Sequence, residues 1–399
     1  MKTKRLEQEN SYRQSFQSQV IAKELRQGKA WVALAESAFY PSSGGQLFDI
    51  GSLNDLPVSN VEKEGDLVWH QLEQDSLQVG DSVAGVIDWS RRFRHMQRHS
   101  AQHLLSQALL KINADFETKA VSLSSETCTV DFAANPEAHD LLKAEELVNT
   151  IAYQNLAIRA FEVDEQDIAK YPLRRPPKVS GRIRLVEMGD FELSACGGTH
   201  VRSTAEVAPI KILRLERIRG GLSRVYFKAG LEALADYREK HEVCTQLGQK
   251  FSAQVAELPA RVDALSQDLL DTRFKLKEAQ HDNAQYLARE LIAQAKANNT
   301  NVIVHSLDAN SEALLAPLAQ ALTQVLDYAL LGLKSPEKAS LLFTRSETAS
   351  HPMNDLLKNV LPLIGGRGGG KADRAQGAGS RLEGLAEALS QAAKLLNKP

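Results

Sequence analysis

Short apolar stretches interrupted by glycine turns make up the first 90 residues of the chain. Residues 30–34 and 67–72 are apolar or alternate between apolar and polar positions, as strands do. Glycines punctuate the intervals between such runs, at Gly44-Gly45, Gly51, Gly65-Asp66 and Gly80-Asp81. The pattern predicts an N-terminal β-barrel over residues 1–90.

Strand and helix patterns alternate in the next part of the chain. Strand-like runs occur at residues 127–132, 158–163 and 183–187, and a helix is expected over residues 136–155. Another helix is expected around residues 98–105, where Ala101 and Leu105 begin an apolar stripe. The mixture predicts an α+β domain over residues 91–229.

Residues 230–297 are helical and highly charged, and we expect them to form an arm. Apolar positions recur there at alternating spacings of three and four, which is typical of a coiled-coil seam. Pro259 fits only in the first turn of a helix, so a break before it predicts two helices. Dimerisation and an intramolecular helical hairpin both explain this seam. Its members are Leu258, Val262, Leu265, Leu269, Thr272, Leu276, Ala279 and Tyr286.

The last segment, residues 298–399, predicts a small α/β domain. Its elements read strand, helix, strand, strand, helix, loop, helix, which makes the fold class of the whole chain multidomain α+β. The loop, residues 365–371, matches G-x-x-x-x-G-K, but Ala372 replaces the hydroxyl that binds magnesium, so a nucleotide-binding P-loop is excluded. Arg367, Lys371 and Arg374 instead indicate contact with an RNA backbone, and a flexible surface loop is the alternative.

Composition restricts the classes of function. The chain has 399 residues, enough for two or three domains, and a formal net charge of −2, so any nucleic acid must be held by local basic patches. Three cysteines do not form a disulfide framework, which favours a reducing compartment. Neither an N-terminal apolar leader nor a membrane-spanning run is present, and we expect a cytoplasmic protein without membrane contact.

Two separated motifs supply candidate metal ligands. His99 and His103 are four positions apart, so both imidazoles lie on one face of the predicted helix. Cys196 and His200 flank two glycines that allow a tight turn. Three imidazoles and one thiolate are ligands that Zn²⁺ prefers, so one zinc ion per chain is predicted. An HxxxH pair alone also arises by chance on helices without metal.

Two other features suggest binding. Arg91 and Arg92 lie at the start of the histidine helix, where a phosphate-facing patch and a solvated helix start are both plausible. His95 in this stretch is interpreted as a phosphate or structural contact rather than a metal ligand. Before the helix, Gly44-Gly45-Gln46 either lets the backbone approach a ligand or forms a plain hairpin turn.

Taken in order, these motifs resemble the editing domain of alanyl-tRNA synthetase and the freestanding AlaX alanyl-tRNA editing proteins, in their long form. The similarity covers nearly the whole chain. It is carried by Gly44-Gly45-Gln46, His99-Ser100-Ala101-Gln102-His103, Leu173-Arg174-Arg175, Lys178-Val179-Ser180-Gly181, Cys196-Gly197-Gly198-Thr199-His200-Val201, Arg217-Ile218-Arg219-Gly220-Gly221 and the stretch from Gly365 to Lys371.

The resemblance implies a function and site residues. His99, His103, Cys196 and His200 would bind zinc, and Gln46, Ser37 and Thr199 would form the aminoacyl pocket. Contacts to tRNA would come from Arg91, Arg92, Arg174, Arg175, Arg219, Arg367, Lys371 and Arg374. Ser37 stands where many relatives have threonine, so its hydroxyl is kept. The last segment would match the DHH-associated domain of alanyl-tRNA synthetases, and the arm or this segment would support a homodimer.

The implied activity is hydrolysis in trans of the ester in mischarged Ser-tRNA(Ala), with Gly-tRNA(Ala) as a second candidate substrate. Serine differs from alanine by one hydroxyl, which a synthetic site rejects poorly, so a hydrolytic second sieve is useful. The alternative is a non-catalytic, zinc-containing tRNA-binding relative of the synthetase. A complete alanine–tRNA ligase is not expected, because little sequence precedes the zinc-binding region. A metallopeptidase is disfavoured because Ser100 replaces the glutamate of H-E-x-x-H.

Overall fold

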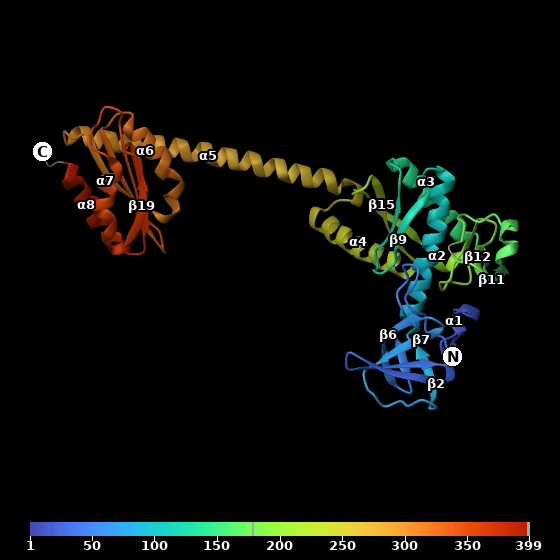
Figure 1. Ribbon diagram of the computed structural model, residues 1–399. Helices are drawn as coiled ribbons and strands as arrows, with labels where there is room; N and C mark the ends of the chain where they lie inside the picture. The colour runs from blue at the N-terminus through green and yellow to red at the C-terminus, as the bar shows by residue number, and fades with distance from the viewer. Residues whose placement is uncertain (178, 397–399) are drawn as a thin grey trace. The chain divides into compact units, whose positions relative to one another are not determined.

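The computed structural model describes residues 1–177 and 179–396 (Figure 1). Lys178, which opens the predicted Lys178–Gly181 motif, lies outside the described residues. The chain divides into two compact units, Met1–Gln246 and Leu247–Pro399. The finer division at residues 90, 229 and 297 stays a prediction. Within the described residues, no helix has both the length and the apolar character needed to cross a bilayer.

Six antiparallel strands close into a barrel at the start of the first unit, in the order β2-β3-β7-β6-β5-β8. Its interior is an apolar cluster that includes Phe16, Val32, Leu34 and Val61. The strands are β2 (Ser15–Arg26), β3 (Lys29–Leu34), β5 (Gly51–Leu53), β6 (Leu56–Glu64), β7 (Leu67–Leu72) and β8 (Ser82–Ile87). Ahead of them, β1 (Lys4–Arg5) leads into helix α1 (Leu6–Glu9) and pairs in parallel with β4 (Glu36–Ser37).

Helix α2 (Trp89–Ile112) is the central element of the rest of this unit. The Asp88 carboxylate caps it by accepting a hydrogen bond of 3.0 Å from the Arg91 backbone N–H. Its apolar side chains, among them Leu104 and Leu109, join the largest core cluster of the described residues. Because most of its length is buried, α2 also holds polar side chains in fixed positions, and these include both predicted histidine ligands.

Two antiparallel sheets and two further helices accompany α2. One sheet has the order β14-β15-β10-β9 and the other β11-β12-β13. Their strands are β9 (Thr118–Ser122), β10 (Cys128–Phe132), β11 (Ile158–Asp164), β12 (Arg182–Met188), β13 (Glu192–Ala195), β14 (Ile210–Ile218) and β15 (Leu222–Ala229). The helices are α3 (Ala138–Tyr153), which packs against α2, and α4 (Gly230–Phe251). The predicted α+β composition of this region is confirmed.

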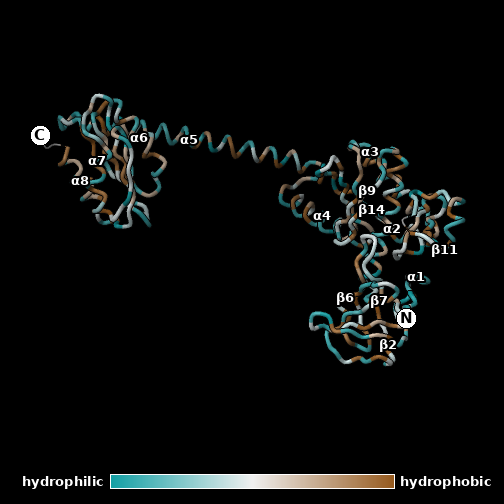
Figure 2. The backbone as a smooth tube through the Cα atoms, viewed as in Figure 1, coloured by the Kyte–Doolittle hydropathy of each residue, from teal (hydrophilic) through white to brown (hydrophobic). Residues whose placement is uncertain are grey.

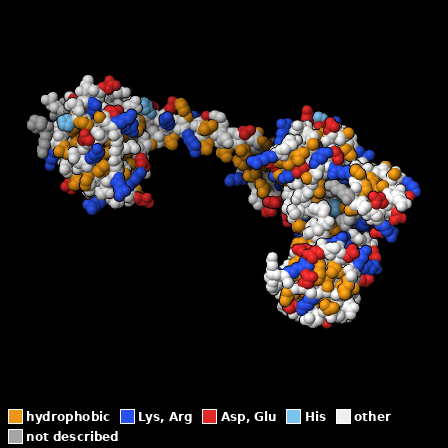
Figure 3. Space-filling model, viewed as in Figure 1, with side chains coloured by type: hydrophobic (Ala, Val, Ile, Leu, Met, Phe, Trp, Pro, Cys, Tyr) orange, Lys and Arg blue, Asp and Glu red, His pale blue; other side chains and the backbone are white. Residues whose placement is uncertain are grey.

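The second unit contains the 40-residue helix α5 (Leu258–Ala297), which has Pro259 in its first turn. A break before Pro259 was predicted, and the separation of α4 from α5 confirms it. Apolar and polar positions alternate along α5 (Figure 2), and hydrophobic side chains show on the surface of this helix (Figure 3). The predicted seam residues Leu265, Leu269 and Leu276 are at least half exposed. Ala284, Ala288 and Leu291 near its end are buried.

A five-stranded sheet of order β16-β17-β18-β20-β19 forms the rest of the second unit. Ala329 and Leu331 pack with α5 and α6, whereas Leu330 between them packs with α7 and α8, so helices cover both faces. The elements are β16 (Val302–Asp308), α6 (Leu315–Thr323), β17 (Tyr328–Lys334), β18 (Ala339–Arg345), α7 (Met353–Val360), β19 (Gly366–Gly370), β20 (Arg374–Gly379) and α8 (Leu385–Leu396).

The prediction of a loop at residues 365–371 is partly wrong. Residues 366–370 form the edge strand β19, which pairs antiparallel with β20. Neither strand was predicted, because both are rich in glycine and lack the β-branched and aromatic residues that mark strands. The backbone of this segment is therefore held by a sheet rather than free.

Candidate metal centre

Four side chains that are distant in sequence meet beside α2. His99 and His103 come from α2, and Cys196 and His200 come from the segment after β13, and one donor atom of each lies within 4.8 Å of all the others. The Cys196 sulfur is 3.4 Å from His99 Nε2 and 3.3 Å from His200 Nε2. Zinc with ordinary Zn–N and Zn–S bonds in a tetrahedron gives about 3.5 Å for this separation. The donor set and its spacing therefore fit one Zn²⁺ ion.

Every imidazole of this cluster has its Nδ1 occupied by a hydrogen-bonding partner. His99 Nδ1 lies 2.8 Å from the Gln46 amide oxygen, and His200 Nδ1 lies 3.0 Å from the Ser100 hydroxyl. Such partners fix the tautomer and orientation of a metal-ligating histidine. In each ring, Nε2 is therefore the nitrogen that remains free to coordinate a metal ion.

His103 has the strongest support. Its Nδ1 lies 3.1 Å from the Ser194 hydroxyl and 3.3 Å from a Glu192 carboxylate oxygen. Burial raises the pKa of Glu192, but the charges of His103 and Arg174 and two hydrogen bonds outweigh it, so the pKa is lowered. Glu192 is therefore ionised and stabilises the His103 ring through a charge-assisted bond. Neither Glu192 nor Ser194 was predicted.

The surroundings of Cys196 favour its thiolate form. Burial raises the pKa of Cys196, but its electrostatic interactions with His99, His200 and His103 outweigh burial and hold the pKa well below its usual value. The Gly198 backbone N–H also donates to the sulfur at 3.4 Å. On β12, Arg184 donates to the Cys196 and Gly198 carbonyl oxygens at 2.8 and 3.0 Å, which fixes the turn.

Gln46 connects the barrel to the ligand-bearing segment. Gly44 and Gly45 both have positive φ, and Ser43 and Gln46 pair across them, so this loop is a two-residue hairpin turn. Besides contacting His99, the Gln46 amide donates to Thr199 Oγ1 at 2.7 Å and accepts from the Thr199 backbone N–H at 3.2 Å. Gln46 is 1% exposed, so it acts first as a bridge between the two loops.

Ser37 lies in a hydrogen-bond network inside the barrel. His70 Nδ1 contacts the Val32 carbonyl at 3.2 Å and therefore carries the ring proton, so Ser37 donates to His70 Nε2 at 2.8 Å. Burial lowers the pKa of His70 to about 4, which keeps the ring neutral. The Phe39 N–H donates to the same hydroxyl at 3.1 Å, so Ser37 has only acceptor capacity left.

Arg92 does not contact phosphate, and that prediction is wrong. Its side chain is fully buried and forms an ion pair with Asp49, which is buried as well. It also donates to the Ala38 carbonyl at 2.5 Å and to the Ser11 carbonyl at 2.8 Å. Arg92 thus attaches the first turn of α2 to the barrel.

Arg174, another predicted tRNA contact, lies beside the candidate metal centre, and its contact with tRNA stays a prediction. Its side chain is 9% exposed and its Nε donates to Glu192 at 3.0 Å. Because Glu192 contacts His103, Arg174 supports the position of His103 indirectly, through Glu192. The Leu-Arg-Arg motif gave no indication of this role, because Arg174 and Glu192 meet only through the fold.

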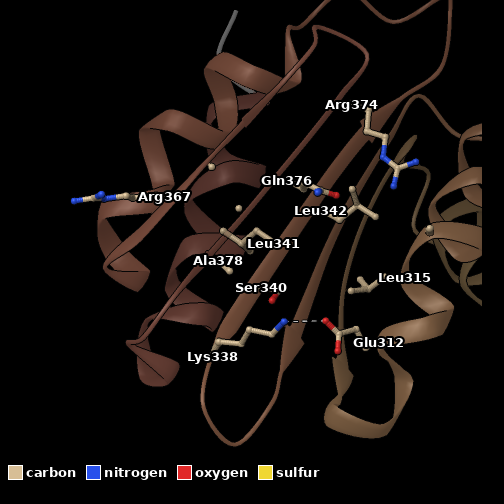
Figure 4. Close-up of a pocket in the computed structure, with 13 residues that line it drawn as sticks. Glu312, Leu315, Lys338, Ser340, Leu341, Leu342, Arg367, Arg374, Gln376 and Ala378 are labelled. Carbon is tan, nitrogen blue, oxygen red and sulfur yellow. Dashed lines mark hydrogen bonds and ion pairs between the residues drawn. The ribbon is translucent and has the colours of Figure 1, made fainter. Parts of the chain in front are cut away.

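The other predicted tRNA contacts lie at the surface. Arg219 is exposed in the turn between β14 and β15, whereas Arg175 is about one-third exposed and lies 3.4 Å from Glu117. In the second unit, Arg367, Lys371 and Arg374 are exposed, and Arg367 and Arg374 help line a cavity of about 510 Å³ (Figure 4). These positions permit RNA contact, which stays a prediction.

Comparisons with known proteins agree with this architecture. The family described as "Threonyl and Alanyl tRNA synthetase second additional domain" matches residues 183–226, which include Cys196 and His200. The family "tRNA synthetases class II (A)" matches residues 2–91. The chain is thus similar to tRNA synthetases in both regions of the first unit.

Whole-chain similarity extends to alanine–tRNA ligases. Identity is 29% with the enzyme of Pyrococcus abyssi, 31% with that of Ignicoccus hospitalis and 30% with that of Streptococcus thermophilus. These matches cover 96%, 100% and 93% of this chain but only 43%, 44% and 44% of the relatives. The chain therefore spans less than half the length of these relatives.

Among solved structures, the C-Ala domain of Aquifex aeolicus alanyl-tRNA synthetase aligns with 24% of this chain and 91% of that domain. Sequence identity is 21% and the TM-score is 0.22. A TM-score of this size does not establish a shared fold.

Proposed function

We propose that this chain, which is related to alanine–tRNA ligases along most of its length, is a zinc-dependent aminoacyl-tRNA deacylase. Its substrates would be Ser-tRNA(Ala) and, as a second candidate, Gly-tRNA(Ala). The observation that carries the proposal is the convergence of His99, His103, Cys196 and His200 on one point, with each imidazole held through Nδ1. Histidines that only pack in a protein core do not need hydrogen-bonding partners at every Nδ1.

A zinc ion bound there would polarise the ester carbonyl or lower the pKa of a water molecule. The chain's own residues would choose the substrate. Thr199 accepts a hydrogen bond from Gln46 and so keeps its own O–H available to donate. Ser37 can accept one further bond, which a serine hydroxyl can donate and an alanine methyl cannot. This difference would favour hydrolysis of the mischarged ester.

Four protein ligands fill a tetrahedron, whereas a catalytic zinc keeps one position open. The deacylase proposal therefore requires one ligand to leave. We infer that this ligand would be His99 or His200, because their Nδ1 atoms contact only the neutral Gln46 amide and the neutral Ser100 hydroxyl. By contrast, His103 is held by the Glu192 carboxylate.

The experiment is release of radiolabelled serine, glycine and alanine from the correspondingly charged tRNA(Ala) by the full chain. We expect release of serine, little release of alanine, and loss of both zinc and activity in Cys196→Ala and His103→Ala. Arg159→Ala, an exposed change on β11, is the control and should match the natural chain. Full activity in a metal-free variant would contradict the proposal.

A second candidate function is a non-catalytic tRNA-binding protein with a structural zinc ion. The closed four-ligand set favours it, because structural zinc sites have no open position. The same assay separates the two: a structural site predicts tRNA binding and one zinc per chain without release of any amino acid.

A further inference from the structure

A second polar site lies beside the first turns of α2. It is a cavity of about 470 Å³ whose lining includes Arg91, Arg94 and His95 from α2. The cavity is also lined by Leu47, which follows Gln46, and by Ser125, which lies in the connection between β9 and β10. None of the four candidate metal ligands lines it.

His95 is the unusual member of this lining. Its side chain is 3% exposed, yet neither ring nitrogen has a hydrogen-bond partner among the described residues. Burial, together with the charges of Arg98 and Arg91, lowers the pKa of His95 to about 3, so the ring is neutral. A neutral imidazole can donate one hydrogen bond and accept another, and leaving both unmade in a buried position is costly.

Two arginines of the lining have no acidic partner in contact among residues 1–177 and 179–396. In the described part of the chain, no carboxylate lies within 4.0 Å of the guanidinium of Arg91 or Arg94, whereas Arg98 is neutralised by Glu232 at 2.5 Å. The lining also contains two carboxylates, Asp88, which caps α2, and Glu126, so the attraction for an anion is local to the Arg91 and Arg94 side chains. Arg91 Nε donates to the Phe48 carbonyl oxygen at 3.1 Å, and guanidinium groups without an acidic partner are suited to phosphate oxygens.

Residues that line the cavity are close in sequence to residues of the candidate metal centre. His95 precedes His99 by four residues, which is about 6 Å along a helix axis. Leu47 follows Gln46, whose amide oxygen contacts His99 Nδ1. A ligand whose reacting end lies at the metal centre can therefore place its neighbouring group in this cavity.

We propose that this cavity binds the nucleotide that precedes the esterified terminal nucleotide of the RNA substrate. Arg91 and Arg94 bind its phosphodiester, and one ring nitrogen of His95 forms a hydrogen bond with its ribose 2′-hydroxyl, which can donate or accept. The inference rests on the proposed function and extends it, since it explains how the chain distinguishes RNA next to the ester. His95 and the two arginines act as positioning residues.

The test measures binding of two RNA hairpins by fluorescence anisotropy to the zinc-loaded full chain. Both hairpins end in CCA with serine attached through a stable amide, and one has a 2′-deoxyribose at the penultimate nucleotide. We expect the deoxy change to weaken binding to the natural chain roughly three- to tenfold. His95→Phe should bind both hairpins equally, and Arg94→Ala should weaken binding of the all-ribose hairpin about tenfold. Arg159→Ala is the matched control and should have no effect.

The deoxy change alters only the RNA, so its effect does not depend on how well a variant folds. The proposal is overturned if the deoxy change affects the natural chain and His95→Phe by the same factor, or affects neither. It is also overturned if Arg94→Ala binds like Arg159→Ala. Serine release is measured separately, so a chain that fails to deacylate but still depends on the 2′-hydroxyl contradicts the proposed function and not this site.

Discussion

At the scale of single residues, two adjacent glycines in the ligand-bearing segment have different surroundings. A Cβ atom on Gly198 would lie 2.0 Å from His99 Cε1 and 2.4 Å from His99 Nδ1, both far inside contact distance. A Cβ atom on Gly197 would meet no atom within 4 Å. Of these two positions, Gly198 needs the absence of a side chain so that the segment can pass this close to the His99 ring.

Gly198→Ala should therefore displace His99 and weaken zinc binding, whereas Gly197→Ala should not. Removing a well-oriented ligand partner typically costs about 10- to 100-fold in metal affinity. Competition with a chromophoric chelator measures the zinc affinity of the full chain and both variants. Equal affinities for the two alanine variants would show that His99 does not bind the metal in this position.

The sequence alone identified all four members of the cluster, because ligand chemistry and i, i+4 spacing are local. It did not identify Ser100, Glu192 or Ser194 as partners of the imidazoles. Glu192 contacts His103 across a separation of 89 positions, which no local pattern encodes. It also assigned the same role to Arg91 and Arg92, although only the orientation of α2 against the barrel decides which of them is buried.

At the scale of elements, the ion pair of Arg92 and Asp49 joins α2 to the barrel. Asp49 also accepts a hydrogen bond of 2.6 Å from the Tyr40 backbone N–H, at the start of the loop that ends in Gln46. The pair therefore supports the position of Gln46 against His99.

Arg92→Ala should destabilise the first unit by about 3–5 kcal/mol, because it leaves the Asp49 carboxylate buried without a partner. Arg94→Ala, an exposed change two residues later, should alter stability by no more than about 0.5 kcal/mol. Urea unfolding followed by tryptophan fluorescence reports on this unit, since Trp31, Trp69 and Trp89 all lie in it. Equal midpoints for the two variants would argue against a stabilising role for the pair.

Elements with strong periodicity were predictable from the sequence, and glycine-rich ones were not. The expected helix around residues 98–105 and the break before Pro259 correspond to α2 and to the start of α5. Strands β19 and β20 escaped prediction because pairing within the sheet, rather than side-chain propensity, stabilises them. The exposed seam on α5 is consistent with a homodimer, which stays a prediction.

At the scale of the whole molecule, each unit carries its own candidate RNA contacts. In the second unit these are the exposed side chains Arg367, Lys371 and Arg374 on β19, β20 and the turn between them. Since the net charge of the chain is −2, local groups of this kind must provide any attraction to RNA.

Replacing Arg367 and Lys371 by alanine should weaken tRNA binding and flatten its dependence on salt. Each phosphate interaction that the substitution removes should reduce the slope of log affinity against log salt by about 0.7 to 0.9. Binding titrations across a range of salt concentrations measure the slope. Lys296→Ala with Lys358→Ala removes two exposed charges from the same unit and is the control. An unchanged slope in the first variant would remove these residues from the RNA interface.

The proposed deacylation requires zinc held by His99, His103, Cys196 and His200. Its most direct test is serine release from Ser-tRNA(Ala) by one sample of the full chain, measured as purified, after removal of metal and after addition of one equivalent of zinc. We expect release to stop when the metal is removed and to return when the zinc is added. Release that continues unchanged in the metal-free sample would contradict it.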